Sequence, residues 1–156
     1  MPSLDRLPEA SRKSMLELPV EINQTTPFRR LSKPLATAVV SIVTTAGMHL
    51  HGDRPFVPAD PTFRRIPSSA QGGDLLQSHN SIGFDRTGVM ADVNVVFPID
   101  RLREMVAEGR IGSLGPTLYS FMGAQRDVTA IKTTTAHEVA DRLLEDGVEV
   151  VLLTPT

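Results

Sequence analysis

The sequence predicts an α/β fold, with a layered, mostly parallel sheet and flanking helices. Two apolar runs rich in β-branched residues, 37–45 and 148–153, are typical of strands in such a sheet. A helical pattern leads directly into the second run, and a further helix and strand lie between the two. This alternation of strands and helices favours parallel strands joined by crossover helices.

The C-terminal helix and strand are the most strongly marked part of the chain. Residues 148–153 form a nearly unbroken apolar run, which predicts a strand buried on both faces. Thr135 and Glu138 match a T-x-x-E capping box, and Gly147 suits the left-handed residue that ends a helix. The apolar residues between them fall on one helix face: Val139, Ala140, Leu143 and Leu144. We expect this helix to deliver the chain to the strand.

The remaining chain divides at about residue 34. Residues 1–34 predict an arm or short helix, with a weak helical pattern from Glu9 to Leu18. Residues 35–156 predict the α/β domain, in which strand 37–45 lies beside 148–153. Within it, residues 48–81 carry prolines, the pair Gly72-Gly73 and three of the four histidines without strong periodicity. Such a segment predicts a long functional loop, with Ile66 and Leu75-Leu76 in short strands or helices.

The middle of the domain predicts one helix and one more strand. Residues 93–97 are expected to be extended. Asp100 suits the N-cap of a helix over 101–108, and Gly109 ends it. The run 117–122 then predicts a strand.

Composition excludes several classes of function. A net charge of −2 without a basic run gives no signature of nucleic-acid binding, and the longest apolar stretch, 35–48, is too short to span a bilayer. The N-terminus lacks the apolar core of a secretion signal, so a cytoplasmic protein is the default. The 156 residues include no cysteine, which removes disulfides and cysteine nucleophiles from this chain.

Three histidines are candidates for chemistry. His49 and His51 are two residues apart after a predicted strand, and His79 lies in the long loop. On an extended chain, positions i and i+2 project to the same side, as metal ligands or proton-transfer groups do. The sequence shows no clear third and fourth metal ligand, so we predict no metal site. Capping of loop backbone is the structural alternative.

A polar cluster follows the loop. Asp85, Arg86, Asp92 and Asn94 lie among apolar residues. They suit the binding of a small zwitterion or carboxylate, which Arg86 would hold in a forked pair. Composition alone favours the alternative that these residues form turns.

Several stretches together resemble the selenoprotein B subunits of glycine, sarcosine, betaine and D-proline reductases. The resemblance covers residues 28–156 and is carried by these motifs: TTAG at 44–47, SHNSIGFDR at 78–86, DVNVVFPIDRL at 92–102, AEGRIGSL at 107–114, and the close LLEDGV…LLTPT at 143–156. It implies an oxidoreductase that cleaves a C–N bond reductively, with a dithiol as electron donor.

The resemblance also implies a reactive residue that this chain lacks. In the family, selenocysteine or cysteine follows the strand that ends in a Leu-Thr-x-Thr-like sequence, and this chain ends one residue before that position. We therefore expect a fragment or truncated form, inactive alone, as reading a selenocysteine codon as a stop would produce. The resemblance implies catalytic roles for His79 and Asp85. Substrate binding would fall to His49, Arg86, Asp92 and Asn94.

Three functions follow as hypotheses. The first is the amino-terminal part of a reductase subunit, with a partner reductase subunit and a small amino-acid-like substrate. The second is a non-catalytic binding or partner module of the same fold. The third is a metal-dependent enzyme that uses His49, His51 and His79. In addition, apolar surface left exposed near residues 148–153 predicts self-association.

Overall fold

The computed structural model describes residues 4–17, 22, 24–81 and 83–155. Its contacts divide the chain into two units, 1–30 and 31–156. The first unit contains the 3-10 helix η1 (Leu4–Arg6) and helix α1 (Glu9–Leu16). α1 confirms the helix predicted from Glu9, while its predicted last residue, Leu18, lies outside the described residues. Among the helices of the described residues, none is long and apolar enough to cross a membrane.

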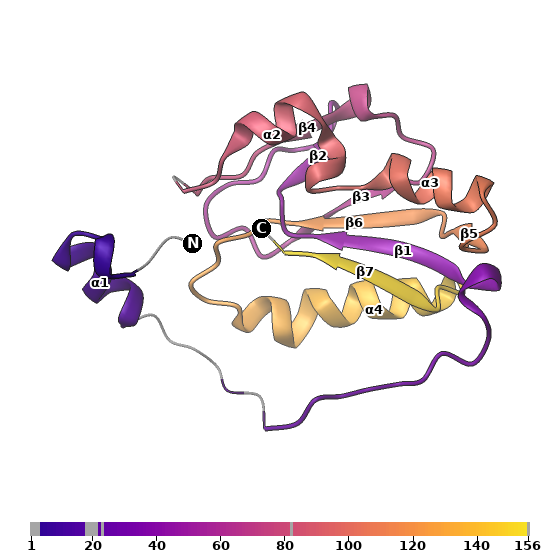
Figure 1. The fold of residues 1–156 in the computed structure, drawn as a ribbon, viewed down its shortest axis with the longest axis horizontal. Coiled ribbons are helices and arrows are strands. Elements are labelled where there is room, and N and C mark those ends of the chain that lie inside the picture. The colour runs from indigo at the N-terminus through magenta and orange to yellow at the C-terminus, as the bar shows by residue number, and fades with distance from the viewer. Residues whose placement is uncertain (1–3, 18–21, 23, 82, 156) are drawn as a thin grey trace. The chain divides into compact units, whose positions relative to one another are not determined.

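The second unit is built on a five-stranded sheet with β1 at its centre (Figure 1). Its strands are β1 (Val39–Thr44), β3 (Phe63–Pro67), β5 (Ser113–Leu114), β6 (Thr117–Phe121) and β7 (Val150–Thr154). β1 pairs in parallel with β5, β6 and β7, and β3 alone is antiparallel, on β6. This arrangement confirms the α/β fold and the predicted adjacency of the first and last strands.

Helices cover both faces of the sheet (Figure 1). Helix α4 (Ala136–Glu145) continues the π-helical turn η5 (Ile131–Thr135) and lies on one face. Helix α3 (Ile99–Ala107) lies on the other face. Gly109 and Gly147 adopt φ values of 70° and 68° after α3 and α4, which confirms both as helix-ending positions.

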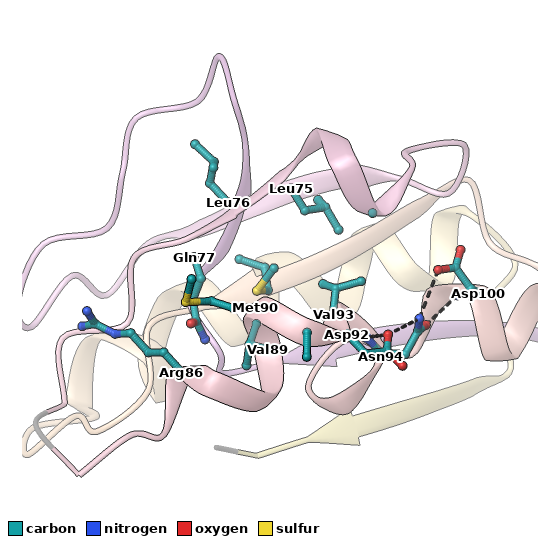
Figure 2. Close-up of a pocket in the computed structure, with 13 residues that line it drawn as sticks. Leu75, Leu76, Gln77, Arg86, Val89, Met90, Asp92, Val93, Asn94 and Asp100 are labelled. Carbon is teal, nitrogen blue, oxygen red and sulfur yellow. Dashed lines mark hydrogen bonds between the residues drawn. The ribbon is translucent and has the colours of Figure 1, made fainter.

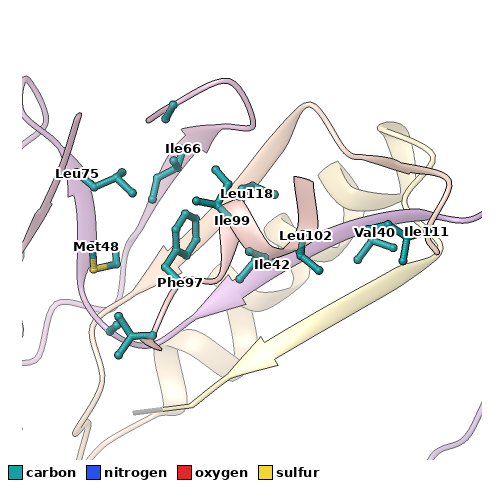
Figure 3. Close-up of a cluster of buried hydrophobic side chains, with 13 residues drawn as sticks. Val40, Ile42, Met48, Ile66, Leu75, Phe97, Ile99, Leu102, Ile111 and Leu118 are labelled. Atoms are coloured by element: carbon teal, nitrogen blue, oxygen red, sulfur yellow. The ribbon is translucent and has the colours of Figure 1, made fainter. Parts of the chain in front are cut away.

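The core is made of two apolar clusters, one on each face of the sheet. The larger contains Ile42, Phe97, Ile99 and Leu118, all fully buried, and packs α3 onto the sheet (Figure 3). The smaller packs α4 onto Tyr119 and its neighbours. Burial of each large apolar side chain contributes roughly 1.5–3 kcal/mol, so these clusters determine which faces of the helices turn inward.

A separate two-stranded ribbon stands beside the sheet. It pairs β2 (Met48–Leu50) antiparallel with β4 (Leu75–Gln77), which the 3-10 helix η3 (Gly72–Asp74) precedes. The segment 48–81, predicted as a long loop, thus contains β2, β3, η3 and β4. Ile66 falls in β3 and Leu75-Leu76 in β4, so the strand alternative holds for both.

Strand β7 is more exposed than the sequence predicts. Leu153 is 66% exposed, and Val151 and Leu152 are 36% and 37% exposed. The prediction of a strand buried on both faces is wrong, because β7 is the outermost strand of the described sheet and pairs only with β1. Its apolar side chains form the exposed surface that was expected near this strand.

Three local predictions are also wrong. Residues 93–95 form the 3-10 helix η4 (Val93–Val95) rather than extended chain. Asp100 lies in the first turn of α3, whose N-cap is Pro98. Thr135 has helical dihedral angles and its hydroxyl donates to the Pro61 carbonyl at 2.9 Å, so it forms no capping box. The helical stretch begins earlier, at residue 129, after Asp127, whose Oδ1 accepts from the Thr129 backbone N–H.

Candidate functional site

A cavity of about 590 Å³ lies between the β2–β4 ribbon and the segment that contains helix α2 (Arg86–Ala91) and η4 (Figure 2). Its apolar lining residues are Met48, Leu75, Leu76, Val89, Met90, Ala91 and Val93, and its polar ones are Gln77, Arg86, Asp92, Asn94 and Asp100, with Gly72. Arg86 lies at one end and the acidic residues at the other (Figure 2). The cavity therefore offers opposite charges separated by an apolar wall.

The acidic end is held by a network of hydrogen bonds. Asp92 Oδ1 accepts from the backbone N–H and the side-chain amide of Asn94, at 2.9 and 2.8 Å. Asn94 in turn donates to Asp100 Oδ2 at 3.1 Å and accepts from the Asp100 backbone N–H at 3.0 Å. Asp100 also pairs with Arg103 at 2.7 Å. The bonds from the Asn94 backbone and side chain lower the pKa of Asp92, which keeps this end negative near neutral pH.

Arg86 is placed by the start of α2. Asp85 Oδ1 accepts from the Thr87 backbone N–H at 2.8 Å and so caps this helix. The bonds from Thr87 lower the pKa of Asp85. Arg86 Nη2 donates to the His79 carbonyl at 2.7 Å. The guanidinium is thereby tied to the segment that follows β4.

His79 is buried and incompletely hydrogen-bonded. Its side chain stacks on Phe84, with 4.4 Å between ring centroids, and its Nδ1 accepts from the Ser81 backbone N–H at 3.2 Å. Burial, and then the charge of Arg86, lower the pKa of His79. A neutral ring whose Nδ1 accepts carries its proton on Nε2, and Nε2 has no partner among the described residues.

The other two histidines do not join His79. His49 is buried, with Nδ1 2.8 Å from the Leu50 carbonyl and Nε2 2.7 Å from Ser78 Oγ. His51 is exposed. Within the described part of the chain, no three histidine or carboxylate side chains come together as a metal site.

The carboxyl ends of β1 and β7 are joined to the wall of the cavity. The hydroxyls of Thr44 and Thr154 both donate to the Val96 carbonyl, at 3.0 and 2.9 Å. Val96 directly follows η4, whose Val93 and Asn94 line the cavity. Ligands of open α/β sheets bind beyond the carboxyl ends of the strands, and this cavity lies against that edge.

Comparison with known proteins decides the family. The profile of the glycine/sarcosine/betaine reductase selenoprotein B family matches residues 5–156. The chain belongs to this family. It is 37% identical to D-proline reductase subunit gamma of Acetoanaerobium sticklandii, over 88% of this chain and 57% of the relative. It is 30% identical to sarcosine reductase complex component B subunit beta of Peptoclostridium acidaminophilum, and 29% identical to glycine reductase complex component B subunit gamma of Carboxydothermus hydrogenoformans.

The family resemblance seen in the sequence is thus confirmed. The alignments to the sarcosine and glycine reductase subunits each cover 90% of this chain and 33% of the relative. The chain therefore spans between a third and just over half the length of these curated relatives. No solved structure matches it.

In this selenoprotein B family chain, the cavity brings together three of the six residues to which the resemblance gives catalytic or substrate-binding roles. Arg86, Asp92 and Asn94 line it, whereas His49, His79 and Asp85 do not. Sequence analysis missed three lining residues, Met48, Gln77 and Asp100. Met48 and Gln77 enter the lining because they are paired in the register of β2 and β4. The sequence does carry a signal for Asp100, an acidic side chain in the same motif as Asn94, but the pattern there equally suits a helix cap.

Proposed function

We propose that this chain forms the substrate-holding part of a reductase B subunit. The reaction is reductive cleavage of the C–N bond of an amino acid or betaine-like molecule, with a dithiol as electron donor and a partner reductase subunit. Family membership supports this reaction class. The observation that carries the assignment to this site is a cavity with Arg86 at one end and Asp92 at the other, against the carboxyl edge of the sheet.

The charges of the cavity suit a zwitterion. Arg86 would bind the substrate carboxylate, because a guanidinium offers donors in a fork that matches a carboxylate. Asp92 would face the ammonium group, and the apolar wall formed by Val89, Val93 and Leu75 would contact the carbon skeleton. We assign Asp85 a positioning role, since it caps the helix that begins with Arg86.

His79 is our candidate for proton transfer. Its ring is neutral near pH 7, and its backbone carbonyl holds the Arg86 guanidinium. A buried N–H without a partner costs free energy unless a ligand or a further segment accepts from it. Because His79 does not line the cavity, we propose that Nε2–H donates to the further segment of the subunit that brings the nucleophile.

The selenolate or thiolate of the reductase reaction has to come from outside these 156 residues, because they contain no cysteine. We propose a selenolate or thiolate just beyond the carboxyl end of β7, where it would attack the substrate carbon as the amine leaves. The nucleotide sequence after the Thr156 codon tests this. An in-frame TGA or cysteine codon, with a reading frame that continues like the relatives, is expected. An unrelated downstream sequence would refute this placement.

Ligand binding tests the cavity directly. NMR titrations of the chain with glycine, sarcosine, betaine and proline should shift resonances of α2 and η4. Arg86→Gln should weaken binding roughly tenfold or more, since a charge-assisted hydrogen bond contributes about 1.5–3 kcal/mol. Arg110→Gln is the matched control, because Arg110 is exposed and pairs with Glu108 after the end of α3, away from the lining residues. Equal binding by Arg86→Gln and the unaltered chain would count against the site. The chain alone should show no reductase turnover.

A second function, a non-catalytic module that binds a partner subunit, is favoured by one observation. Met90 is 87% exposed and Leu76 40% exposed, and both line the cavity. Large exposed apolar side chains at a cavity are typical of partner contacts. If this function is the right one, Met90→Lys would abolish capture of the partner subunit, and no small zwitterion would bind.

A further inference from the structure

A serine and a histidine outside the cavity form a hydrogen-bonded pair. His49 Nε2 lies 2.7 Å from Ser78 Oγ, across the β2–β4 ribbon. His49 is opposite Leu76 in the register, so Ser78, two residues further on, is its diagonal neighbour on the same face. Side chains alternate along a strand, which places this pair on the face opposite Met48 and Gln77. Neither His49 nor Ser78 is among the residues that line the proposed zwitterion cavity.

The direction of proton donation follows from the contacts of the ring. His49 Nδ1 lies 2.8 Å from the Leu50 carbonyl, and a carbonyl can only accept. Nδ1 therefore carries the proton in the neutral imidazole, and Nε2 has a free lone pair. Ser78 Oγ lies 2.7 Å from Nε2, so the Ser78 hydroxyl has to be the donor in this hydrogen bond. The Ser78 hydroxyl thus donates to the His49 imidazole, and the Leu50 carbonyl fixes the orientation of that imidazole. A nucleophile activated by an oriented base has this arrangement.

The surrounding backbone holds this pair in place. The Ser78 backbone N–H donates to the Gly47 carbonyl at 3.0 Å. Gly47 adopts a φ of 67°, and a Cβ there would lie 3.1 Å from the His79 backbone nitrogen. The position is therefore restricted to glycine by both backbone conformation and space. His49 is 2% exposed whereas Ser78 is only half-buried, so the base is shielded and the hydroxyl is the more accessible partner.

We infer that Ser78 is a base-activated nucleophile, able to accept an acyl or phosphonyl group from an activated ester. In this step Ser78 Oγ forms a bond to the carbonyl carbon or phosphorus as its proton moves to His49 Nε2. The bond to the leaving group breaks, and the leaving group departs with its electron pair. The product is an O-acyl or O-phosphonyl serine, and the step needs no redox partner. This reactivity is independent of the proposed reductase function.

Covalent labelling of the whole chain with a fluorophosphonate tests the inference. The expected result is a one-to-one adduct, with loss of fluoride, that peptide mass spectrometry locates at Ser78. Ser78→Ala should abolish it, and His49→Gln should slow it at least tenfold. The matched controls are Ser69→Ala and His51→Gln, which change an exposed serine and an exposed histidine nearby and should label at the original rate. No adduct, an adduct at another residue, or unchanged labelling of His49→Gln would overturn the inference.

A measurement on the unaltered chain guards against a variant that fails to fold. The ¹⁵N chemical shifts of His49 distinguish its tautomers at a pH where the ring is neutral. A proton on Nδ1, the tautomer that the Leu50 carbonyl selects, is expected. A proton on Nε2 would make Ser78 the acceptor and would overturn the inference even if labelling occurred.

Discussion

Replacement of Gly47 by alanine should lower the free energy of unfolding for two reasons, backbone strain and a steric clash, and the same replacement at Gly109 separates them. Gly47 and Gly109 have nearly the same backbone conformation, with φ values of 67° and 70°. A Cβ at Gly109 meets nothing within 4 Å, whereas one at Gly47 approaches the His79 backbone nitrogen at 3.1 Å. Both variants bear the left-handed strain of roughly 1–2 kcal/mol. Only Gly47→Ala also has to move backbone, which costs about 1–3 kcal/mol more by analogy with overpacked cores.

Urea unfolding followed by circular dichroism measures both variants. Gly109→Ala should lower the free energy of unfolding by roughly 1–2 kcal/mol. Gly47→Ala should lower it by about 1–3 kcal/mol beyond that. The effect of alanine on the unfolded chain is common to both variants and cancels in the comparison. Equal losses would refute the argument that the approach of residues 78 and 79 restricts this position to glycine.

Three further predictions concern the fold and its surface. Leu153→Lys should reduce self-association in analytical ultracentrifugation, because Leu153 is 66% exposed on the outermost described strand; an unchanged sedimentation profile would exclude β7 as the contact. Leu118→Ala should lower the free energy of unfolding by about 2–5 kcal/mol, since this side chain is fully buried; a loss below about 1 kcal/mol would contradict the packing. Burial raises the pKa of Asp60, but hydrogen bonds from Thr62 and Arg64 outweigh this and lower it overall. The ionised Asp60 carboxylate therefore stabilises the fold above the ordinary carboxyl pKa, and this stabilisation is lost as the pH falls through the lowered value. Asp60→Asn should accordingly have a lower free energy of unfolding than the unaltered chain at neutral pH and match it in strong acid.

The sequence by itself determined the elements that local chemistry specifies. The strands at 39–44 and 117–121 follow from β-branched apolar runs, and the ends of α3 and α4 follow from Gly109 and Gly147. β-branching and a left-handed glycine act within a few residues, so a pattern in the sequence is enough to locate them. The polar cluster around Arg86 and Asp92 was visible in the same way, since its members are close in the chain.

The tertiary structure alone decided which side chains meet across long separations and which strand lies at the edge. Thr135 looks like a helix cap in sequence, yet its hydroxyl binds the Pro61 carbonyl 74 residues away. His49 and Ser78 are 29 residues apart and meet only through the pairing of β2 with β4. An apolar run looks the same in sequence whether its strand pairs with one neighbouring strand or with two. The exposure of β7 therefore depends on its position at the edge of the described sheet. Pairing and burial are properties of the assembled chain, and a local pattern does not contain them.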